Sequence, residues 1–235
     1  MFYSRQPLEN FRSTCSRGGS IEHPENNFWR LSIPPGGSNQ YRLAQLDDYR
    51  DLPRKEFVWK PGCGFRLNAR ASAQEIPGTW GFGFWNDPFS MGLLGGKGRL
   101  RLPILPQSAW YFFASQHNYL SFRDDIPGAG NLAMSYAPKG FWNKIIYLGL
   151  PAGPLLFFSP VARVARKLLS RIVRHDSVSL DVDVTVWHVY QLRWEGTRVV
   201  FEVDHQVVFK TEISPTDPLG FVLWIDNQYA AFSPT

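Results

Sequence analysis

The feature that most constrains the fold is a period of two in residues 186–211, VWHVYQLRWEGTRVVFEVDHQVVFKT. Aromatic and β-branched side chains alternate there with polar ones, which is typical of strands with one buried face. Residues 195–197 and 204–206 interrupt the pattern with turn-forming side chains. The stretch therefore predicts three consecutive antiparallel strands.

The same period recurs in residues 65–88, FRLNARASAQEIPGTWGFGFWNDP, and in residues 219–231. Residues 109–122, AWYFFASQHNYLSF, predict one long strand, and residues 178–184 predict another. Antiparallel strands with turns between them indicate an all-β protein.

Length and composition predict a single domain. The chain has 235 residues, of which 44% are hydrophobic and 15% are aromatic, so a sizeable core can form. Residues 1–25 are polar and aperiodic and predict an N-terminal arm, which leaves residues 26–235 as the domain. Two cysteines without metal spacing, and no apolar leader after Met1, favour a reduced cytoplasmic protein.

An insertion is expected at residues 140–175. Residues 139–175 carry seven Lys or Arg and no acidic residue, so the net charge of +5 belongs to this segment. Basic side chains confined to one segment argue against a nucleic-acid-binding surface. Ser159 is a suitable N-cap before Pro160, and the apolar and basic residues that follow separate at helical spacing. We therefore expect a basic amphipathic helix of about four turns.

The insertion allows three interpretations. It packs on the sandwich with its arginines in water, it covers a pocket as a lid, or it lies on an anionic membrane surface. The run from Leu148 to Phe158 is too apolar for an ordinary exposed loop. The segment from Phe141 to Arg174 is thus the candidate for membrane association.

The strand motifs resemble those of the concanavalin A-like jelly rolls, notably the family 16 glycoside hydrolases. The resemblance covers residues 57–231 in the right order, with FRLNARAS and GTWGFGFWNDP as its upstream part. In residues 186–211 the matching positions are Trp187, His188, Tyr190, Trp194, Phe201, Val203, Asp204 and Val207. The resemblance implies a jelly-roll β-sandwich of two antiparallel sheets, with a concave face that takes carbohydrate.

The chain departs from that family at the catalytic strand. The family carries Glu-x-Asp-x-x-Glu there, whereas residues 109–122 contain no acidic residue and place His117 near that position. A hairpin glycine of the family is also replaced, by His205. The resemblance therefore implies a non-hydrolytic relative. No cofactor is expected from the residues, and a structural calcium ion is a feature that only the resemblance implies.

The candidates for a site are of two kinds. They are polar residues inside the predicted strands and aromatic residues that neighbour glycines. Aromatic rings stack on sugar rings, and amides and carboxylates bind hydroxyl groups. The expected ligand-binding residues are Trp80, Phe84, Trp85, Asn86, Trp110, Gln116, Asn118, Trp224 and Asn227. The candidate acid and base groups are His117, Asp87 and Asp226, because a carboxylate that faces a histidine orients it and raises its pKa.

Three functions remain open from the sequence. The first is a carbohydrate- or glycoconjugate-binding module with an aromatic and polar cleft. The second is an enzyme acting on a hydrophobic small molecule or a glycolipid, with the insertion as lid. The third is a peripheral membrane protein that uses the insertion.

Overall fold

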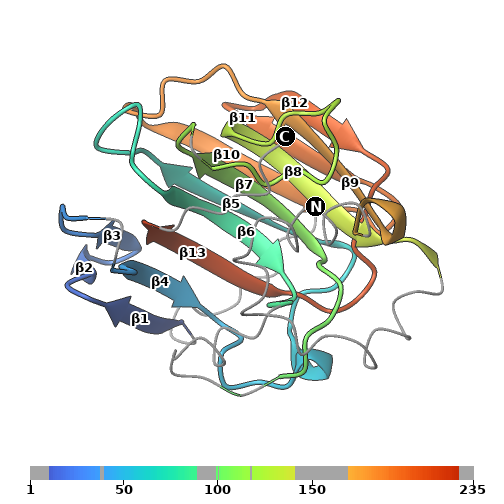
Figure 1. The fold of residues 1–235 in the computed structure, drawn as a ribbon, viewed down its shortest axis with the longest axis horizontal. Helices are drawn as coiled ribbons and strands as arrows, with labels where there is room; N and C mark the ends of the chain where they lie inside the picture. Colours follow the sequence, from blue (N-terminus) through green and yellow to red (C-terminus); the bar gives the residue numbers. More distant parts are fainter. Residues whose placement is uncertain are drawn as a thin grey trace.

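The protein is a jelly-roll β-sandwich of two antiparallel sheets, as predicted. Its structure is a computed structural model, which describes residues 11–37, 40–88, 99, 101–116, 118–140 and 169–227. The larger sheet crosses the molecule as seven strands, and the smaller sheet packs against it (Figure 1). Segments distant in sequence are neighbours, since β13, near the end of the chain, lies between β4 and β6.

The strands of the larger sheet lie in the order β1-β4-β13-β6-β7-β8-β9. Their bounds in that order are Arg12–Ser16, Leu43–Asp47, Gly220–Asp226, Thr79–Trp85, Ser108–Ala114, Gly130–Pro138 and Val173–Ser179. The smaller sheet has the order β12-β11-β10-β5, with bounds Gln206–Thr211, Val199–Val203, His188–Trp194 and Cys63–Ala69. A separate hairpin joins β2 (Ser20–Glu25) to β3 (Phe28–Ser32), and Arg54–Glu56 form a 3-10 turn.

The three consecutive strands predicted from residues 186–211 are confirmed as β10, β11 and β12. Asp204 and His205 both take positive φ in the turn between β11 and β12, at 50° and 69°. A two-residue hairpin turn of this kind matches the right-handed twist of the strands that it joins. Local turn chemistry and the period of two were therefore sufficient to predict this sheet.

The main core lies between the sheets and consists largely of rings. Phe82 of β6, Tyr111 of β7 and Tyr190 of β10 belong to it, and each is at most 2% exposed. The Tyr111 hydroxyl lies 2.9 Å from the Gln191 carbonyl oxygen and 2.8 Å from that of Glu202. It thus ties the larger sheet to the backbone of the smaller one, and burial raises the Tyr111 pKa well above its usual range.

A second apolar cluster covers part of the outer face of the larger sheet, the face turned away from the smaller sheet. It is built on β7, β8 and the residues just before β9, with Phe112, Met134 and Tyr136 among its buried members. Leu105 and Phe122, from the loops beside β7, complete the cover. Trp110 and Trp224 pack against the edge of this cluster, next to the outer face of β6.

Residues 1–25 do not form an arm throughout. Within the described part, β1 pairs with β4 as an edge strand of the larger sheet, and β2 belongs to the separate hairpin. The sequence lacked a signal here because both are edge strands with mostly exposed or half-buried side chains. Backbone pairing with β4, rather than an apolar period, holds β1 in place.

The long strand predicted for residues 109–122 ends at Ala114. The Asn118 backbone N–H donates to the Ser115 carbonyl at 2.9 Å, and its side-chain amide donates to the Gly78 carbonyl at 3.0 Å. These bonds close a turn, so Asn118 does not project from a sheet face. The prediction was wrong because a turn fixed by a buried asparagine leaves no mark in the hydrophobic period.

The end of the predicted insertion also differs. Residues 169–172 are helical, but Val173 begins β9, which pairs with β8 through Ser179. Residues 173–175 were expected inside the helical insertion, and here the open edge of β8 supplies backbone partners that override the helical pattern. Residues 141–168, with most of the predicted amphipathic helix, lie outside the described residues.

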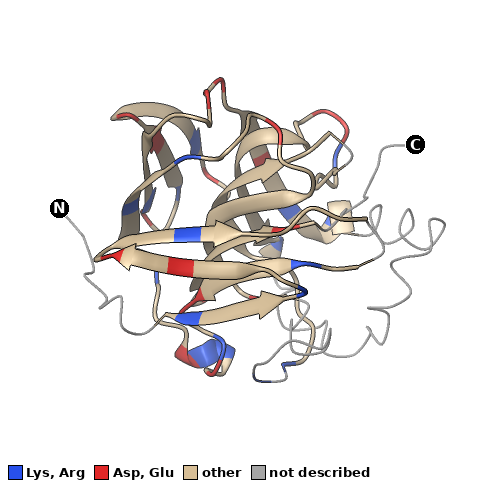
Figure 2. Cartoon of the chain, turned by 90° about the vertical axis from the view of Figure 1, so that its left-hand side faces the viewer, with Lys and Arg blue, Asp and Glu red and all other residues tan. Residues whose placement is uncertain are grey.

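Acidic and basic residues are interspersed over the described strands (Figure 2). Within the described residues, no helix is long and apolar enough to cross a membrane.

Candidate functional site

The alternation of side chains along β6 decides which residues reach the outer face of the larger sheet. Phe82 and Phe84 point into the core, so Gly81, Gly83 and Trp85 lie on the outer face. A β carbon on Gly83 would stand 2.5 Å from Cβ of Trp110, and Gly83 has a φ of +153°. The two glycines therefore let tryptophans from the adjacent strands approach the backbone of β6 closely.

Four rings lie in contact with one another over these glycines, and we call them the aromatic strip: Trp85, Trp110, Phe112 and Trp224. The Trp85 and Trp110 rings are 5.9 Å apart, the Trp110 and Trp224 rings 5.4 Å, and the Phe112 and Trp224 rings 5.9 Å. The three tryptophans are only partly buried, whereas Phe112 packs into the second apolar cluster. The strip thus presents tryptophan surface on a rigid sheet.

A hydrogen-bond network fixes one end of the strip. Nε1 of Trp224 donates to the Thr79 hydroxyl at 3.0 Å, and Thr79 donates to Oδ1 of Asp226 at 2.7 Å. The Tyr41 hydroxyl donates to Oδ2 of the same carboxylate at 3.2 Å. Burial and the neighbouring Asp226 raise the pKa of Tyr41, so its hydroxyl stays protonated and keeps donating.

Trp110, in the middle of the strip, differs from Trp224 and resembles Trp85 in this respect. Its Nε1 atom is buried and donates to no described residue. An unused buried donor costs roughly 1–3 kcal/mol.

The two carboxylates on the described strands of the outer face lie far from each other. On the described strands of this face they are Asp47 and Asp226, because β7 projects Ser108, Trp110, Phe112 and Ala114 outward. Asp47 pairs with Val222, four residues from Asp226 along β13, which places the two about 13 Å apart. Retaining enzymes need about 5–5.5 Å and inverting ones about 6.5–9.5 Å.

Both carboxylates are also engaged in the fold. Oδ2 of Asp47 accepts hydrogen bonds from Gln45 at 2.9 Å and from Arg50 at 2.5 Å. Asp226 holds Thr79 and Tyr41, as described above. Their partners indicate that these groups position the strands and rings around them rather than carry protons to a substrate.

The structure separates two of the candidate acid and base groups, Asp87 and Asp226. Asp87 follows β6 and forms a buried ion pair with Arg101, with Oδ2 at 2.7 Å from Nη1. Asp226 pairs with Thr79 at the other end of β6, so the two carboxylates lie about 20 Å apart or more. His117 lies outside the described residues. Asp87 and Asp226 cannot serve one reaction centre.

The expected ligand-binding residues divide into groups. Trp85, Trp110 and Trp224 share the strip. Phe84 does not, because it is 0% exposed in the core between the sheets, and the same alternation that turns Trp85 outward turns it inward. Trp80 is half-buried on the inner side and stacks on Phe113, beside the exposed Gln116 at the mouth of the sandwich.

The three asparagines of the expected set have structural roles. Asn86 donates to the Leu105 carbonyl at 2.8 Å and accepts from the Gln107 backbone at 3.1 Å. Asn118 closes the turn after β7. Asn227 accepts from the Arg42 backbone at 2.6 Å and donates to the Gln40 carbonyl at 2.8 Å. Each amide links two loops and is occupied in doing so.

Sequence reasoning missed Phe112, Thr79 and Tyr41. Phe112 was identifiable, because it lies two residues after Trp110 on the same strand and must share its face. Thr79 and Tyr41 had no such signal, since both meet Asp226 only through pairings across the sheet. No cluster of three or more His, Cys, Asp or Glu suited to a metal ion occurs among the described residues.

Comparisons with known proteins give structural matches alone. No family model and no curated protein matches the chain. The similar solved structures include a glycoside hydrolase family protein from Mycobacterium thermorestibile, with 11% identity and a TM-score of 0.41 over 80% of this chain and 66% of that one. A GlcNAcα1-4Gal-releasing endo-β-galactosidase from Clostridium perfringens has 12% identity and a TM-score of 0.47 over 100% and 57%.

A Bacillus licheniformis β-glucanase has 10% identity and a TM-score of 0.41 over 95% of this chain and 86% of that one. The chain therefore spans 66% of the length of the mycobacterial protein and 57% of that of the clostridial enzyme.

Proposed function

We propose that the protein binds a carbohydrate or glycoconjugate along the aromatic strip without cleaving it. The observation that carries the proposal is the row of three partly exposed tryptophans on the outer face of the larger sheet. Pyranose rings have an apolar face of C–H groups, and rigid aromatic surfaces bind such faces at little entropic cost. Spacings of 5.4–5.9 Å between rings make the surface continuous enough for more than one sugar unit.

Polar groups beside the rings supply the second element of sugar recognition. The Tyr41 hydroxyl and the Asp226 carboxylate lie at one end of the strip, next to Thr79. Ligand sites of this kind combine apolar walls with a few polar groups of fixed position.

The separation of the described carboxylates supports binding without hydrolysis. The outward positions of β7 carry Ser108, Trp110, Phe112 and Ala114, which hold no proton donor of suitable acidity and no carboxylate nucleophile. The two carboxylates on the described outer face are about 13 Å apart, as derived from the strand register.

The experiment is a calorimetric titration of the full chain with a panel of oligosaccharides, together with an assay for newly formed reducing ends. We expect saturable binding and no reducing ends. Trp110→Ala and Trp224→Ala should each weaken binding about tenfold or more, as the loss of a central aromatic contact does. Trp187→Ala is the matched control, because Trp187 is 52% exposed and lies outside the strip.

Two outcomes would overturn the proposal. One is binding that Trp110→Ala and Trp224→Ala leave unchanged, and the other is cleavage of a bound oligosaccharide. Association with a membrane through residues 141–174 and a cytoplasmic location both stay predictions from the sequence.

A further inference from the structure

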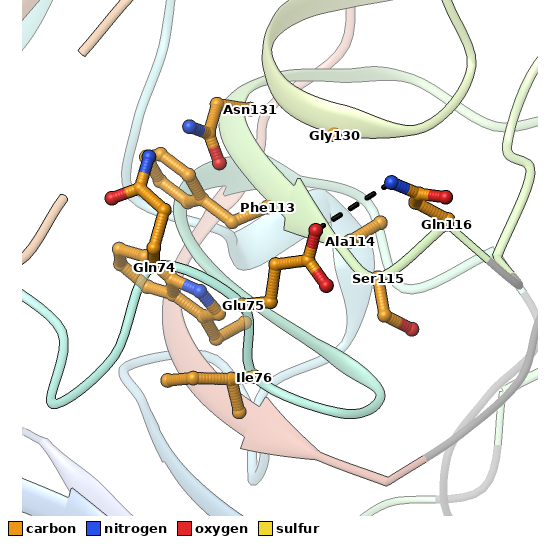
Figure 3. A pocket seen from close by; sticks show the side chains of 10 residues that line it. Gln74, Glu75, Ile76, Phe113, Ala114, Ser115, Gln116, Gly130 and Asn131 are labelled. Atoms are coloured by element: carbon orange, nitrogen blue, oxygen red, sulfur yellow. Dashed lines mark hydrogen bonds between the residues drawn. The ribbon is translucent and has the colours of Figure 1, made fainter. Parts of the chain in front are cut away.

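A small pocket opens at the end of the sandwich where β6 begins and β7 ends (Figure 3). Its volume is about 160 Å³. A cavity of about 150 Å³ in another protein holds one benzene ring, so this pocket accommodates one six-membered ring and little more. The sequence did not predict the pocket, because its walls come from the loop before β6, the end of β7 and the start of β8.

Aromatic rings form one side of the pocket. Trp80 and Phe113 are stacked with centroids 3.8 Å apart and planes 8° from parallel. Phe113 is buried in the main core, so it holds the tryptophan ring from behind, while Trp80 keeps part of its surface exposed. The stack gives the pocket a flat apolar wall of fixed orientation.

Polar side chains form the rim. Gln74, Glu75, Gln116 and Asn131 line the pocket, and Figure 3 shows the Glu75 carboxylate facing the Gln116 amide. Nε2 of Gln116 donates to Oε1 of Glu75 at 3.5 Å, and Nε2 of Gln74 donates to the Val182 carbonyl at 3.3 Å. Both bonds are long and exposed, so a ligand replaces them at low cost.

We propose that this pocket binds a single pyranose ring, either a free monosaccharide or the terminal unit of a glycan. The flat Trp80 wall fits the C–H face of the ring. The side-chain amides both donate and accept hydrogen bonds, and the Glu75 carboxylate accepts them. Sugar hydroxyl groups are suitable partners, because each can donate and accept a hydrogen bond. An apolar ring is a poor ligand, because it would desolvate these rim groups without replacing their hydrogen bonds to water. An anion is a poor ligand as well, because the Glu75 carboxylate would repel it.

The pocket is separate from the aromatic strip. Trp80 belongs to the inner side of β6, whereas Trp224 lies over the outer side. The proposal therefore does not require the strip to bind a glycan, and either site can fail while the other stands.

The test is a titration of the isotope-labelled full chain with methyl glucoside, methyl galactoside and methyl N-acetylglucosaminide, followed by NMR. We expect at least one of them to shift the Trp80 indole N–H signal and the Gln116 side-chain amide signal saturably, with a Kd on the order of millimolar. Gln116→Ala and Glu75→Ala should each raise this Kd at least fivefold. Both side chains are exposed, so neither replacement threatens the fold.

Matched controls separate the two sites. Gln191→Ala removes a glutamine from the smaller sheet, and Trp224→Ala removes a ring of the strip, so both should leave the Kd at the pocket within twofold. The proposal is overturned if none of the glycosides shifts Trp80 at about 50 mM, well above that affinity range. It is equally overturned if Gln116→Ala and Glu75→Ala both bind the glycosides as tightly as the parent protein does. A third contrary result is a pocket that takes cations instead, in which tetramethylammonium shifts the Trp80 signal and the glycosides do not.

Discussion

The ring of Trp224 lies over Gly81 so closely that a β carbon on Gly81 would stand 2.8 Å from Cη2 of the indole. The same carbon would stand 2.3 Å from the Tyr111 carbonyl oxygen on the other neighbouring strand. The absence of a side chain at one position of β6 thus sets how near a ring of β13 comes to the sheet. The aromatic strip depends on this close approach.

We predict that Gly81→Ala lowers the free energy of unfolding by about 2–3 kcal/mol, since the added methyl group overlaps both a ring and a backbone oxygen. Chemical denaturation measures the change. Gly62→Ala is the comparison, because its β carbon meets nothing within 4 Å and carries only the cost of a φ of +98°. Equal losses in the two variants would contradict the steric explanation.

Replacing Asp87 should affect stability rather than chemistry. Its carboxylate is 1% exposed and pairs with Arg101, whose guanidinium also donates to the carbonyls of Tyr49 and Leu52. Breaking a buried pair from one side costs about 3–5 kcal/mol, so Asp87→Asn should lower the melting temperature markedly. Ligand binding at the aromatic strip, measured below that temperature, should stay unchanged. A loss of binding by folded protein would argue for a direct role of Asp87.

Asp48 should give the protein an unusual dependence on pH. Burial raises the pKa of Asp48 to about 6, although its carboxylate accepts hydrogen bonds from Trp59 and from the Phe221 backbone. The folded protein then binds more protons than the unfolded chain between about pH 4 and 6. This group therefore makes stability fall as pH rises through that window, by about 3 kcal/mol in total.

The measurement is a series of denaturation curves between pH 4 and 7 for the parent and for Asp48→Asn. The variant has no carboxyl group at this position, so its stability should lose that decline. If the two slopes are the same, the shifted pKa of Asp48 does not contribute.

The two cysteines should differ in reactivity. Burial raises the pKa of Cys63 to about 12, so almost none of it is the reactive thiolate at neutral pH. Burial raises the pKa of Cys15 as well, but this thiol lies on the exposed edge strand β1. A disulfide reagent should therefore label Cys15 quickly under native conditions. It should label Cys63 only when the protein unfolds. Cys15→Ser should abolish the fast phase, and a fast phase that persists in this variant would contradict the assignment.

Part of the site was predictable from local pattern alone. Trp85 and Trp110 each lie within strongly alternating strands, so their membership of a sheet face followed from the period of two. Phe84 was misplaced because the alternation shows that it opposes Trp85 but does not say which of the two faces the core. The contacts of Phe84 with Trp59, Phe65 and Phe221 decide that question, and these residues come from three other segments.

The sequence by itself determined the all-β class, the hairpins of residues 186–211 and the lack of an acidic residue on the strand that became β7. Each of these depends on neighbours within a few positions, where side-chain direction and turn chemistry act. The tertiary structure alone decided that β7 stops at Ala114, that Asp87 and Asp226 lie at opposite ends of β6, and that a pocket forms beside Trp80. Pairing between strands far apart in the chain sets these distances, and such pairing depends on register and packing that no local pattern specifies.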